Sequence, residues 1–143
     1  MKDSELRQPE LNLLDEKTPF EMVKAMHEKF GIDYNGEPRK LTEKEKAFRI
    51  VCLREEITEY EEARSKQDEL DALIDLMVFA YGTLERHGYP FKRPFMAVML
   101  ANLKKKLAAA CHIVSKRSFD IDLVKPDGWT APKMGMFVGE EEQ

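Results

Sequence analysis

Residues 54–60 read REEITEY, and residues 71–77 read DALIDLM. In each segment, carboxylates stand three or four residues apart, so they share one face of a helix. In each segment, at least one carboxylate also falls among apolar neighbours. A buried charge is costly unless it is paired or bound to a metal ion. The two segments therefore predict two helices that turn acidic side chains toward a common interior.

A helical wheel separates the glutamates of the first segment. At about 100° per residue, Glu55 falls on a solvated face. Glu56 and Glu59 fall in an apolar arc that also holds Cys52 and Ile57. The wheel thus selects these two glutamates as inward-facing. The open alternative is that they lie on the rim of the arc and extend to water.

Asp75 stands in the second segment within an almost wholly apolar stretch, residues 72–82. Aspartate is rarely buried unless it is paired, so this carboxylate needs a partner. Asp71 lies one turn earlier, within about 40° of Asp75 on the wheel. The alternative to a metal site is a structural salt bridge from Asp75 to Arg49 or Lys105.

The acids on these two helices suit a hard cation. No histidine stands at ligand spacing, and carboxylate oxygens alone are typical ligands of Mg²⁺. A di-iron bundle would need Glu-x-x-His on its helices, which the sequence lacks. No glycine-rich phosphate loop is present either. The pattern predicts a magnesium site that serves a phosphate-bearing substrate.

Composition bounds the class of protein. The chain has 143 residues, 23 basic and 27 acidic side chains and a net charge of −4, which gives no electrostatic case for nucleic-acid binding. Two cysteines, Cys52 and Cys111, fit reduced core thiols better than a disulfide framework. The N-terminal residues carry charges and no apolar run, so we expect no signal peptide, no membrane span and a cytoplasmic location.

Start and stop signals outline the helices. Thr18-Pro19 opens the first helix, which stops at Gly31, and Thr42 opens the second. Residues 65–67 read as a turn, with Asp68 capping a third helix that ends at Gly88. A fourth helix is predicted from Phe95 to at least Lys106, with a possible extension to Val114. No segment shows the alternation of a strand.

These elements predict an all-α fold, a four- to five-helix antiparallel bundle. Residues 1–17 form a polar arm, residues 18–116 the helical metal-binding catalytic domain, and residues 117–143 an irregular tail. Such a core is too thin to cover the apolar third helix alone. A homodimer, or a dimer of dimers, would supply the missing helices.

The ordered motifs resemble the all-α nucleoside triphosphate pyrophosphohydrolases, the MazG-like group, and above all its short single-domain phage and bacterial members. That family carries Glu-x-x-Glu on one helix and Glu-x-x-Asp on the next. Glu56 and Glu59 match the first motif, and Asp75 matches the final aspartate. Ala72 stands where the family has its third glutamate, and Asp71 is the substitute one residue earlier.

Two later segments are similar to the same group. Tyr81-Gly82-Thr83-Leu84 resembles its helix end, and Asn102 and Lys105 stand where it carries an asparagine and a lysine. The stretch at 125–129, Lys-Pro-Asp-Gly-Trp, resembles its C-terminal signature. The set spans residues 20–132, which makes it far more specific than an isolated Glu-x-x-Glu.

The resemblance implies cleavage of a nucleoside triphosphate between its α and β phosphates, giving a monophosphate and pyrophosphate. It assigns Mg²⁺, with Mn²⁺ as a substitute, to Glu56, Glu59, Asp71 and Asp75. Glu56, Glu59 and Asp75 are the catalytic set, with Glu56 the preferred candidate base. The implied substrate-binding residues are Asn102 for sugar or phosphate, Lys105 and Lys125 for phosphate oxygens, and Trp129 as a base-stacking ring or a lid; Phe20 and Phe30 are further candidates for a base pocket.

Two alternatives stay open. One is the related phosphoribosyl-ATP pyrophosphohydrolase of histidine biosynthesis, which has a fixed metabolic substrate. The C-terminal Lys-Pro-Asp-Gly-Trp stretch argues against that enzyme. The other is a non-catalytic helical oligomer of the same fold, and Ala72 is the one feature in its favour.

Overall fold

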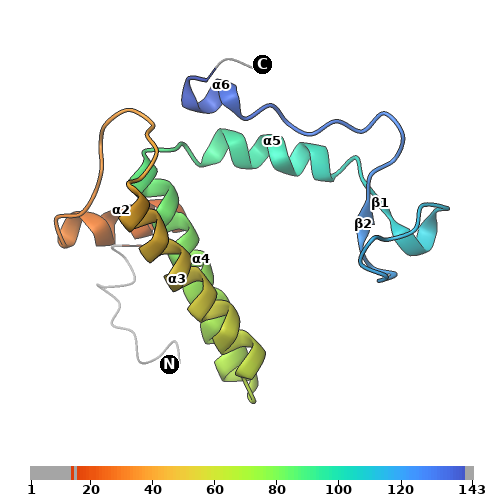
Figure 1. The fold of residues 1–143 in the computed structure, drawn as a ribbon, viewed down its shortest axis with the longest axis horizontal. Helices are drawn as coiled ribbons and strands as arrows, with labels where there is room; N and C mark the ends of the chain where they lie inside the picture. The colour runs from red at the N-terminus through yellow and green to blue at the C-terminus, as the bar shows by residue number, and fades with distance from the viewer. Residues whose placement is uncertain (1–13, 15, 141–143) are drawn as a thin grey trace. The chain divides into compact units, whose positions relative to one another are not determined.

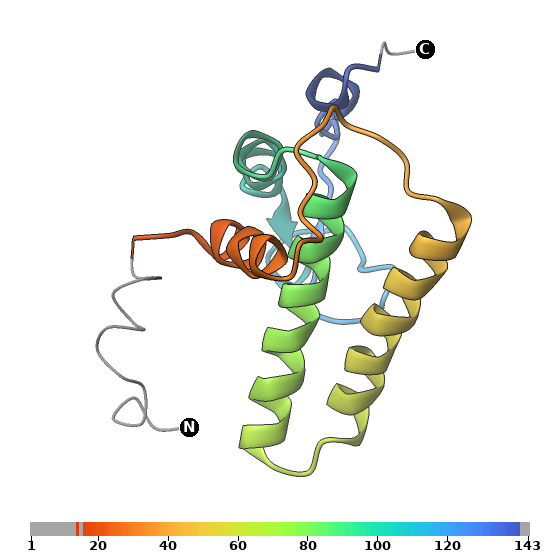
Figure 2. The same cartoon turned by 90° about the vertical axis from the view of Figure 1, so that its left-hand side faces the viewer.

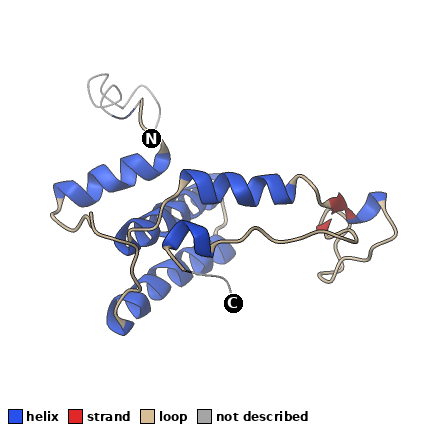
Figure 3. Ribbon diagram, turned by 90° about the horizontal axis from the view of Figure 1, so that it is seen from above, coloured by secondary structure: helices blue, strands red, loops and turns tan. Residues whose placement is uncertain are grey.

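The computed structural model describes residues 14 and 16–140. The chain divides into two compact units, Met1–Tyr89 and Pro90–Gln143. The predicted polar arm at 1–17 lies mostly outside the described residues. Helices dominate the remainder, with only two short strands among the described residues (Figure 3). The predicted all-α class is confirmed.

Side-chain caps start the helices that lie in residues 16–89 of the first unit. The Thr18 hydroxyl accepts from the backbone N–H of Glu21 at the start of α2 (Pro19–Lys29). Thr42 and Ser65 cap α3 (Glu43–Glu62) and α4 (Lys66–His87) in the same way. The prediction that Asp68 caps the third helix is wrong, because the Ser65 hydroxyl accepts from the Asp68 N–H and the helix begins at Lys66.

The α3 and α4 helices form an antiparallel hairpin, and α2 packs across α4 (Figures 1 and 2). The three-residue connection at 63–65 forces the two helices to lie side by side. Gly88 ends α4 with φ of +70°, a left-handed conformation that glycine adopts without strain. The hairpin therefore sets the REEITEY segment of α3 opposite the DALIDLM segment of α4.

The interior of this unit is small and unusually polar. Among residues 14 and 16–89, the buried apolar side chains are Val23, Cys52 and Ala72. Many apolar side chains of α3 and α4 stay exposed. They are Phe48, Ile50, Val51, Ile57, Tyr60, Leu70, Leu73, Ile74 and Met77. None of the helices formed by residues 14 and 16–140 has both the length and the apolar character needed to span a membrane.

The second unit departs from the predicted helix. The α5 helix runs over Lys92–Asn102 and stops before the three consecutive lysines at 104–106. The chain then forms β1 (Lys106–Leu107), which pairs antiparallel with β2 (Leu123–Val124). The short η2 (Ala108–Ala110) follows β1, and α6 (Gly135–Val138) lies near the end. The predicted helix to Lys106 or Val114 is wrong because the strand pairing and repulsion among the lysines outweigh the helix propensity of the alanines.

Candidate metal centre

Three carboxylates meet between α3 and α4. Glu56 and Glu59 stand one turn apart on α3, and Asp75 projects from α4. One oxygen from each of the three lies within 4.8 Å of the others. The carboxylate group, as we call Glu56, Glu59 and Asp75 from here on, unites the three predicted catalytic residues.

Glu56 is the buried member of this group, with a relative exposure of 7%. Its Oε2 atom has no hydrogen-bond donor among the described residues. The pKa of Glu56 is raised to about 7, chiefly by burial and further by a hydrogen bond with Glu59 and by the adjacent charges of Glu59, Asp75 and Asp71. Glu56 and Glu59 can share a hydrogen bond only while one of them is protonated. Once Glu56 ionises, the arrangement is a set of like charges in need of a cation.

Asp75 is half-buried and lies among other acids. Burial raises the pKa of Asp75, and the charges of Asp71 and Glu59 raise it further. No lysine or arginine of the described residues forms an ion pair with Asp75. Arg49 instead lies near Glu45 and Glu85. The structure thus gives no support to the alternative of a salt bridge to Arg49.

The donor set fits a hard divalent cation. All its donors are carboxylate oxygens, which is the chemistry that Mg²⁺ and Mn²⁺ prefer. The buried, donor-free Oε2 of Glu56 is an acceptor that the protein alone leaves unsatisfied, and such atoms are uncommon in folded proteins. A cation would satisfy this oxygen and offset the repulsion among the three acids.

Asp71 and Ala72 lie beside the carboxylate group without joining it. Asp71 is exposed, and none of its oxygens falls within the 4.8 Å cluster. Its negative charge nevertheless raises the pKa of both Glu56 and Asp75, which places it within electrostatic range. Ala72 is 2% exposed and supplies no ligand atom. A role for Asp71 as the fourth ligand stays a prediction.

The raised pKa of Glu56 has a consequence for stability in the absence of metal. The unfolded chain releases this proton near the ordinary value of 4.5, whereas the folded protein keeps it until about 7. The folded state therefore binds more protons between these values, and the free energy of unfolding falls as pH rises through that window.

Urea denaturation in the presence of a chelator measures this effect. From about pH 4.5 to 7 the wild type should lose stability relative to Glu56→Gln, which cannot ionise. Glu55→Gln, an exposed neighbour, should follow the wild type. Parallel pH profiles for wild type and Glu56→Gln would show that Glu56 is not held in a protonated state.

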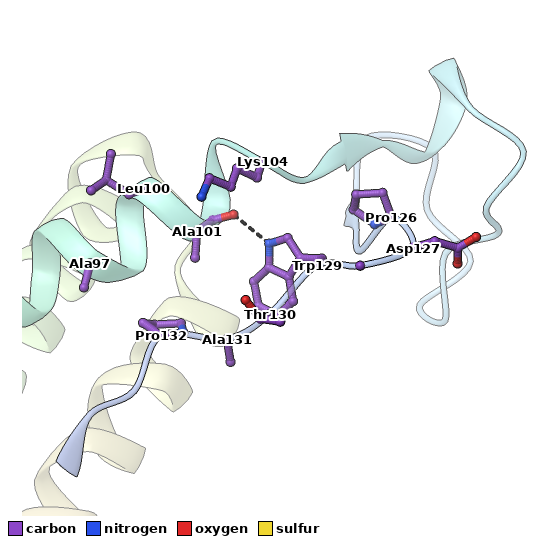
Figure 4. Close-up of a pocket in the computed structure, with 11 residues that line it drawn as sticks. Ala97, Leu100, Ala101, Lys104, Pro126, Asp127, Trp129, Thr130, Ala131 and Pro132 are labelled. Atoms are coloured by element: carbon purple, nitrogen blue, oxygen red, sulfur yellow. Dashed lines mark hydrogen bonds between the residues drawn. The ribbon is translucent and has the colours of Figure 1, made fainter. Parts of the chain in front are cut away.

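The predicted substrate-binding residues lie in the second unit. The indole Nε1–H of Trp129 donates to the backbone oxygen of Ala101 at 2.7 Å (Figure 4). The Nζ atoms of Lys105 and Lys125 lie 5.2 Å and 4.9 Å from the centroid of the Trp129 ring. Asn102 is half-buried at the last position of α5, next to Ala101.

Two cavities flank this arrangement. Trp129 lines one of about 460 Å³ with Ala97, Pro126 and Pro132 (Figure 4). Lys105 and Lys125 line a second of about 340 Å³, which also holds Lys116 and Arg117. Arg117 is paired with Asp122 at 2.8 Å. The second unit therefore gathers the two predicted phosphate-binding lysines around the predicted tryptophan.

Sequence reasoning missed a buried polar cluster at the other end of the α3–α4 hairpin. His27 Nδ1 lies 2.6 Å from Glu85 Oε1, and both residues are 2% exposed. Glu85 also accepts from Lys24 and from the backbone N–H of Tyr34, at 3.2 Å and 2.9 Å. Burial alone raises the pKa of Glu85, but these donors bring it below its ordinary value.

No local sequence pattern predicts that cluster, because His27 and Glu85 are 58 residues apart in the chain. Arg49, also buried, does stand seven residues before Glu56 on the same stripe of α3. That spacing is the one sequence signal that could have marked Arg49 as an interior residue.

Comparison with known proteins agrees with this architecture. A family model described as phosphoribosyl-ATP pyrophosphohydrolase matches residues 23–102, which is more than half of the chain. The match contains the carboxylate group, Asp71 and Asn102, and it ends before Lys105 and the C-terminal Lys-Pro-Asp-Gly-Trp stretch. No curated protein matches the chain.

Proposed function

The chain belongs to the phosphoribosyl-ATP pyrophosphohydrolase family, and from this premise we propose that it is a Mg²⁺-dependent nucleoside triphosphate pyrophosphohydrolase. This family is part of the all-α MazG-like superfamily, so the resemblance seen in the sequence is confirmed. Its members are pyrophosphohydrolases that act on nucleotides. The carboxylate group, with the donor-free Oε2 of Glu56, is the observation that carries the proposal.

Glu56, Glu59 and Asp75 would hold the cation. A bound Mg²⁺ or Mn²⁺ supplies charge neutralisation at the phosphates and lowers the pKa of a water molecule. Glu56 would orient the attacking water and accept its proton on a carboxylate oxygen. The water oxygen bonds to the α-phosphorus, the bond from that phosphorus to the bridging oxygen breaks, and pyrophosphate leaves with the bonding electrons.

We propose that residues of the second unit contribute to recognition of the phosphates. Lys105 and Lys125 would contact phosphate oxygens as point charges. Trp129 is fixed by its hydrogen bond to Ala101 and lies next to both ammonium groups, so we propose that it orders the lysines. Asn102, three residues before Lys105, would bond the sugar or a phosphate.

A substrate panel tests this proposal against its alternatives. Pyrophosphate release is measured for ribo- and deoxyribonucleoside triphosphates and for phosphoribosyl-ATP, with Mg²⁺ and with a chelator. The proposal expects turnover of at least one simple triphosphate. Turnover of phosphoribosyl-ATP alone would identify the biosynthetic enzyme. An inactive protein across the panel would favour the non-catalytic oligomer.

Asp71 gives a graded prediction. Its charge reaches Glu56 and Asp75, so Asp71 would help these residues to hold the cation. Asp71→Ala should lower activity by about ten- to a hundredfold, the scale expected for such a group. The decrease should be larger at limiting than at saturating Mg²⁺, and steady-state kinetics at both concentrations measure it.

Glu69→Ala is the matched control, because Glu69 is an exposed acid on the same helix. It should change activity by less than about threefold. Equal and small effects of both substitutions would show that Asp71 takes no part in cation binding. The site would then consist of three carboxylates.

We further propose that a second copy of the chain covers the exposed apolar face of α3 and α4. Leu70, Leu73, Ile74 and Met77 are each more than 40% exposed, which is unusual for so continuous a stretch. A homodimer, or a dimer of dimers, would bury them. Light scattering should give at least twice the chain mass for the wild type and a single-chain mass for Ile74→Lys. A wild-type monomer would contradict this proposal.

A further inference from the structure

A small pocket opens in the first unit between α2, α3 and α4. Three aromatic rings line it, those of Phe30, Phe48 and Phe79, together with Arg49 and His27. Its volume is about 180 Å³. Phe30 and Phe48 are 67% and 58% exposed, so the mouth of the pocket reaches solvent. The pocket is thus an open aromatic site with a cationic side chain in its wall.

Arg49 is the unusual member of this pocket. It is 7% exposed, and its Nε–H has no acceptor among the described residues. A buried N–H of a charged group without an acceptor is costly, so the protein alone leaves this donor unsatisfied. The mechanism proposed above makes no use of it. An acceptor from outside the chain would satisfy it.

Gly82 lets Arg49 take this position. A Cβ atom at residue 82 would lie 3.0 Å from Arg49 Nη1 and 3.2 Å from His27 Nε2. His27 is held in turn by Glu85, through the 2.6 Å contact at Nδ1. Both polar side chains are therefore packed tightly against α4, which favours recognition by a preorganised donor.

The size and walls of the pocket restrict its ligand. An apolar cavity of about 150 Å³ binds benzene, so about 180 Å³ holds a single six-membered ring, whereas part of a fused bicyclic ring would project through the open mouth. Aromatic walls favour stacking on a flat ring. The free guanidinium N–H requires an acceptor on that ring. A pyrimidine with its ring carbonyls meets all three conditions.

The pocket also stands at a suitable distance from the carboxylate group. Arg49 and Glu56 are seven residues apart on α3, which puts them on the same stripe and separates them by about 10 Å. Phe79 follows Asp75 by one turn of α4. The separation of Arg49 from Glu56 is of the order of the span from the phosphates to the base of a nucleotide.

We propose that the pocket of Phe30, Phe48, Phe79 and Arg49 binds the pyrimidine base of the substrate, with Arg49 donating to a ring carbonyl. This assignment rests on the proposed triphosphate hydrolysis for its role. It adds a substrate class, the pyrimidine nucleoside triphosphates, and sets the chain apart from an enzyme whose substrate carries a purine.

Nucleoside binding tests the pocket without hydrolysis. Cytidine, uridine, adenosine and guanosine are titrated into the metal-free full chain, and the Arg49 Nε–H resonance is followed by NMR. A pyrimidine nucleoside should shift this resonance and bind at least about tenfold more tightly than a purine nucleoside. Arg49→Lys should weaken pyrimidine binding by about ten- to a hundredfold. Arg54→Lys, the same change at an exposed site on α3, should bind as the wild type.

Two further measurements complete the test. Val78→Phe, which fills the pocket and keeps Arg49, should also lose pyrimidine binding, and circular dichroism checks the fold of each variant. In steady-state assays, Arg49→Lys should lower kcat/KM for pyrimidine triphosphates by at least about tenfold more than for purine triphosphates.

The outcomes separate this inference from the proposed function. If the protein hydrolyses triphosphates without a pyrimidine preference and binds no nucleoside, the proposed role of the pocket is wrong and the proposed hydrolase activity stands. If the protein binds pyrimidine nucleosides but hydrolyses no triphosphate, the proposed role of the pocket is supported and the proposed hydrolase activity is wrong. A third outcome is that the wild type binds no nucleoside while Arg49→Lys changes the oligomeric mass. That result would show that a second copy of the chain occupies the pocket, and the inference would be wrong.

Discussion

Replacing Glu56 with glutamine should lower kcat/KM for metal-dependent nucleotide hydrolysis by at least about a hundredfold. Residues that only support metal ligands cost ten- to a hundredfold when they are replaced, so a ligand itself should cost at least the upper value. Glu56 is also the candidate base, and glutamine cannot accept a proton from water. The measurement is initial-rate kinetics at saturating Mg²⁺.

Glu55→Gln is the matched control, an identical change at the adjacent, exposed position of α3. It should alter kcat/KM by less than about threefold. A Glu56→Gln variant that is folded and retains wild-type activity would remove Glu56 from the catalytic set.

Adding Mg²⁺ or Mn²⁺ should raise the melting temperature of the wild type by roughly 10 °C at a hundredfold excess over the dissociation constant. The reason is that the cation binds the folded carboxylate group and relieves the repulsion among Glu56, Glu59 and Asp75. Asp75→Asn should abolish most of this increase. The metal-free Asp75→Asn protein should be at least as stable as the wild type, because it lacks one of the negative charges that repel each other.

Thermal unfolding monitored by circular dichroism, with metal and with a chelator, gives all four melting temperatures. Glu69→Gln serves as a control on the exposed face of α4 and should keep the metal-dependent increase. If the metal-free Asp75→Asn protein is unfolded, Asp75 has a structural role instead. The proposed metal site would then have no ligand from α4.

Local signals predicted most of the hairpin that carries the site. Thr18 and Thr42 start helices where the capping pattern places them, and Gly88 ends α4 in the left-handed conformation. The wheel correctly selected Glu56 as buried, and it placed Glu59 close enough for its carboxylate to join the cluster. These features depend on residues within one or two turns of each other.

Features that depend on distant pairing were not predictable in this way. The chain from Lys104 to Ala110 favours helix by propensity, yet β1 forms because residues 123 and 124 supply a partner strand. The wheel also placed Glu59 inside, whereas this residue is exposed in the single chain. The pocket of Arg49 requires α2, α3 and α4 together, and only the tertiary structure shows that its Nε–H lacks an acceptor.

Hydrolysis in ¹⁸O-labelled water tests the central claim most directly. A pyrimidine triphosphate is incubated with the full chain and Mg²⁺, and the products are separated and examined by ³¹P NMR and mass spectrometry. The account predicts monophosphate that carries one ¹⁸O atom, unlabelled pyrophosphate, and no turnover with a chelator. Labelled pyrophosphate, orthophosphate as the first product, or turnover that a chelator leaves unchanged would contradict it.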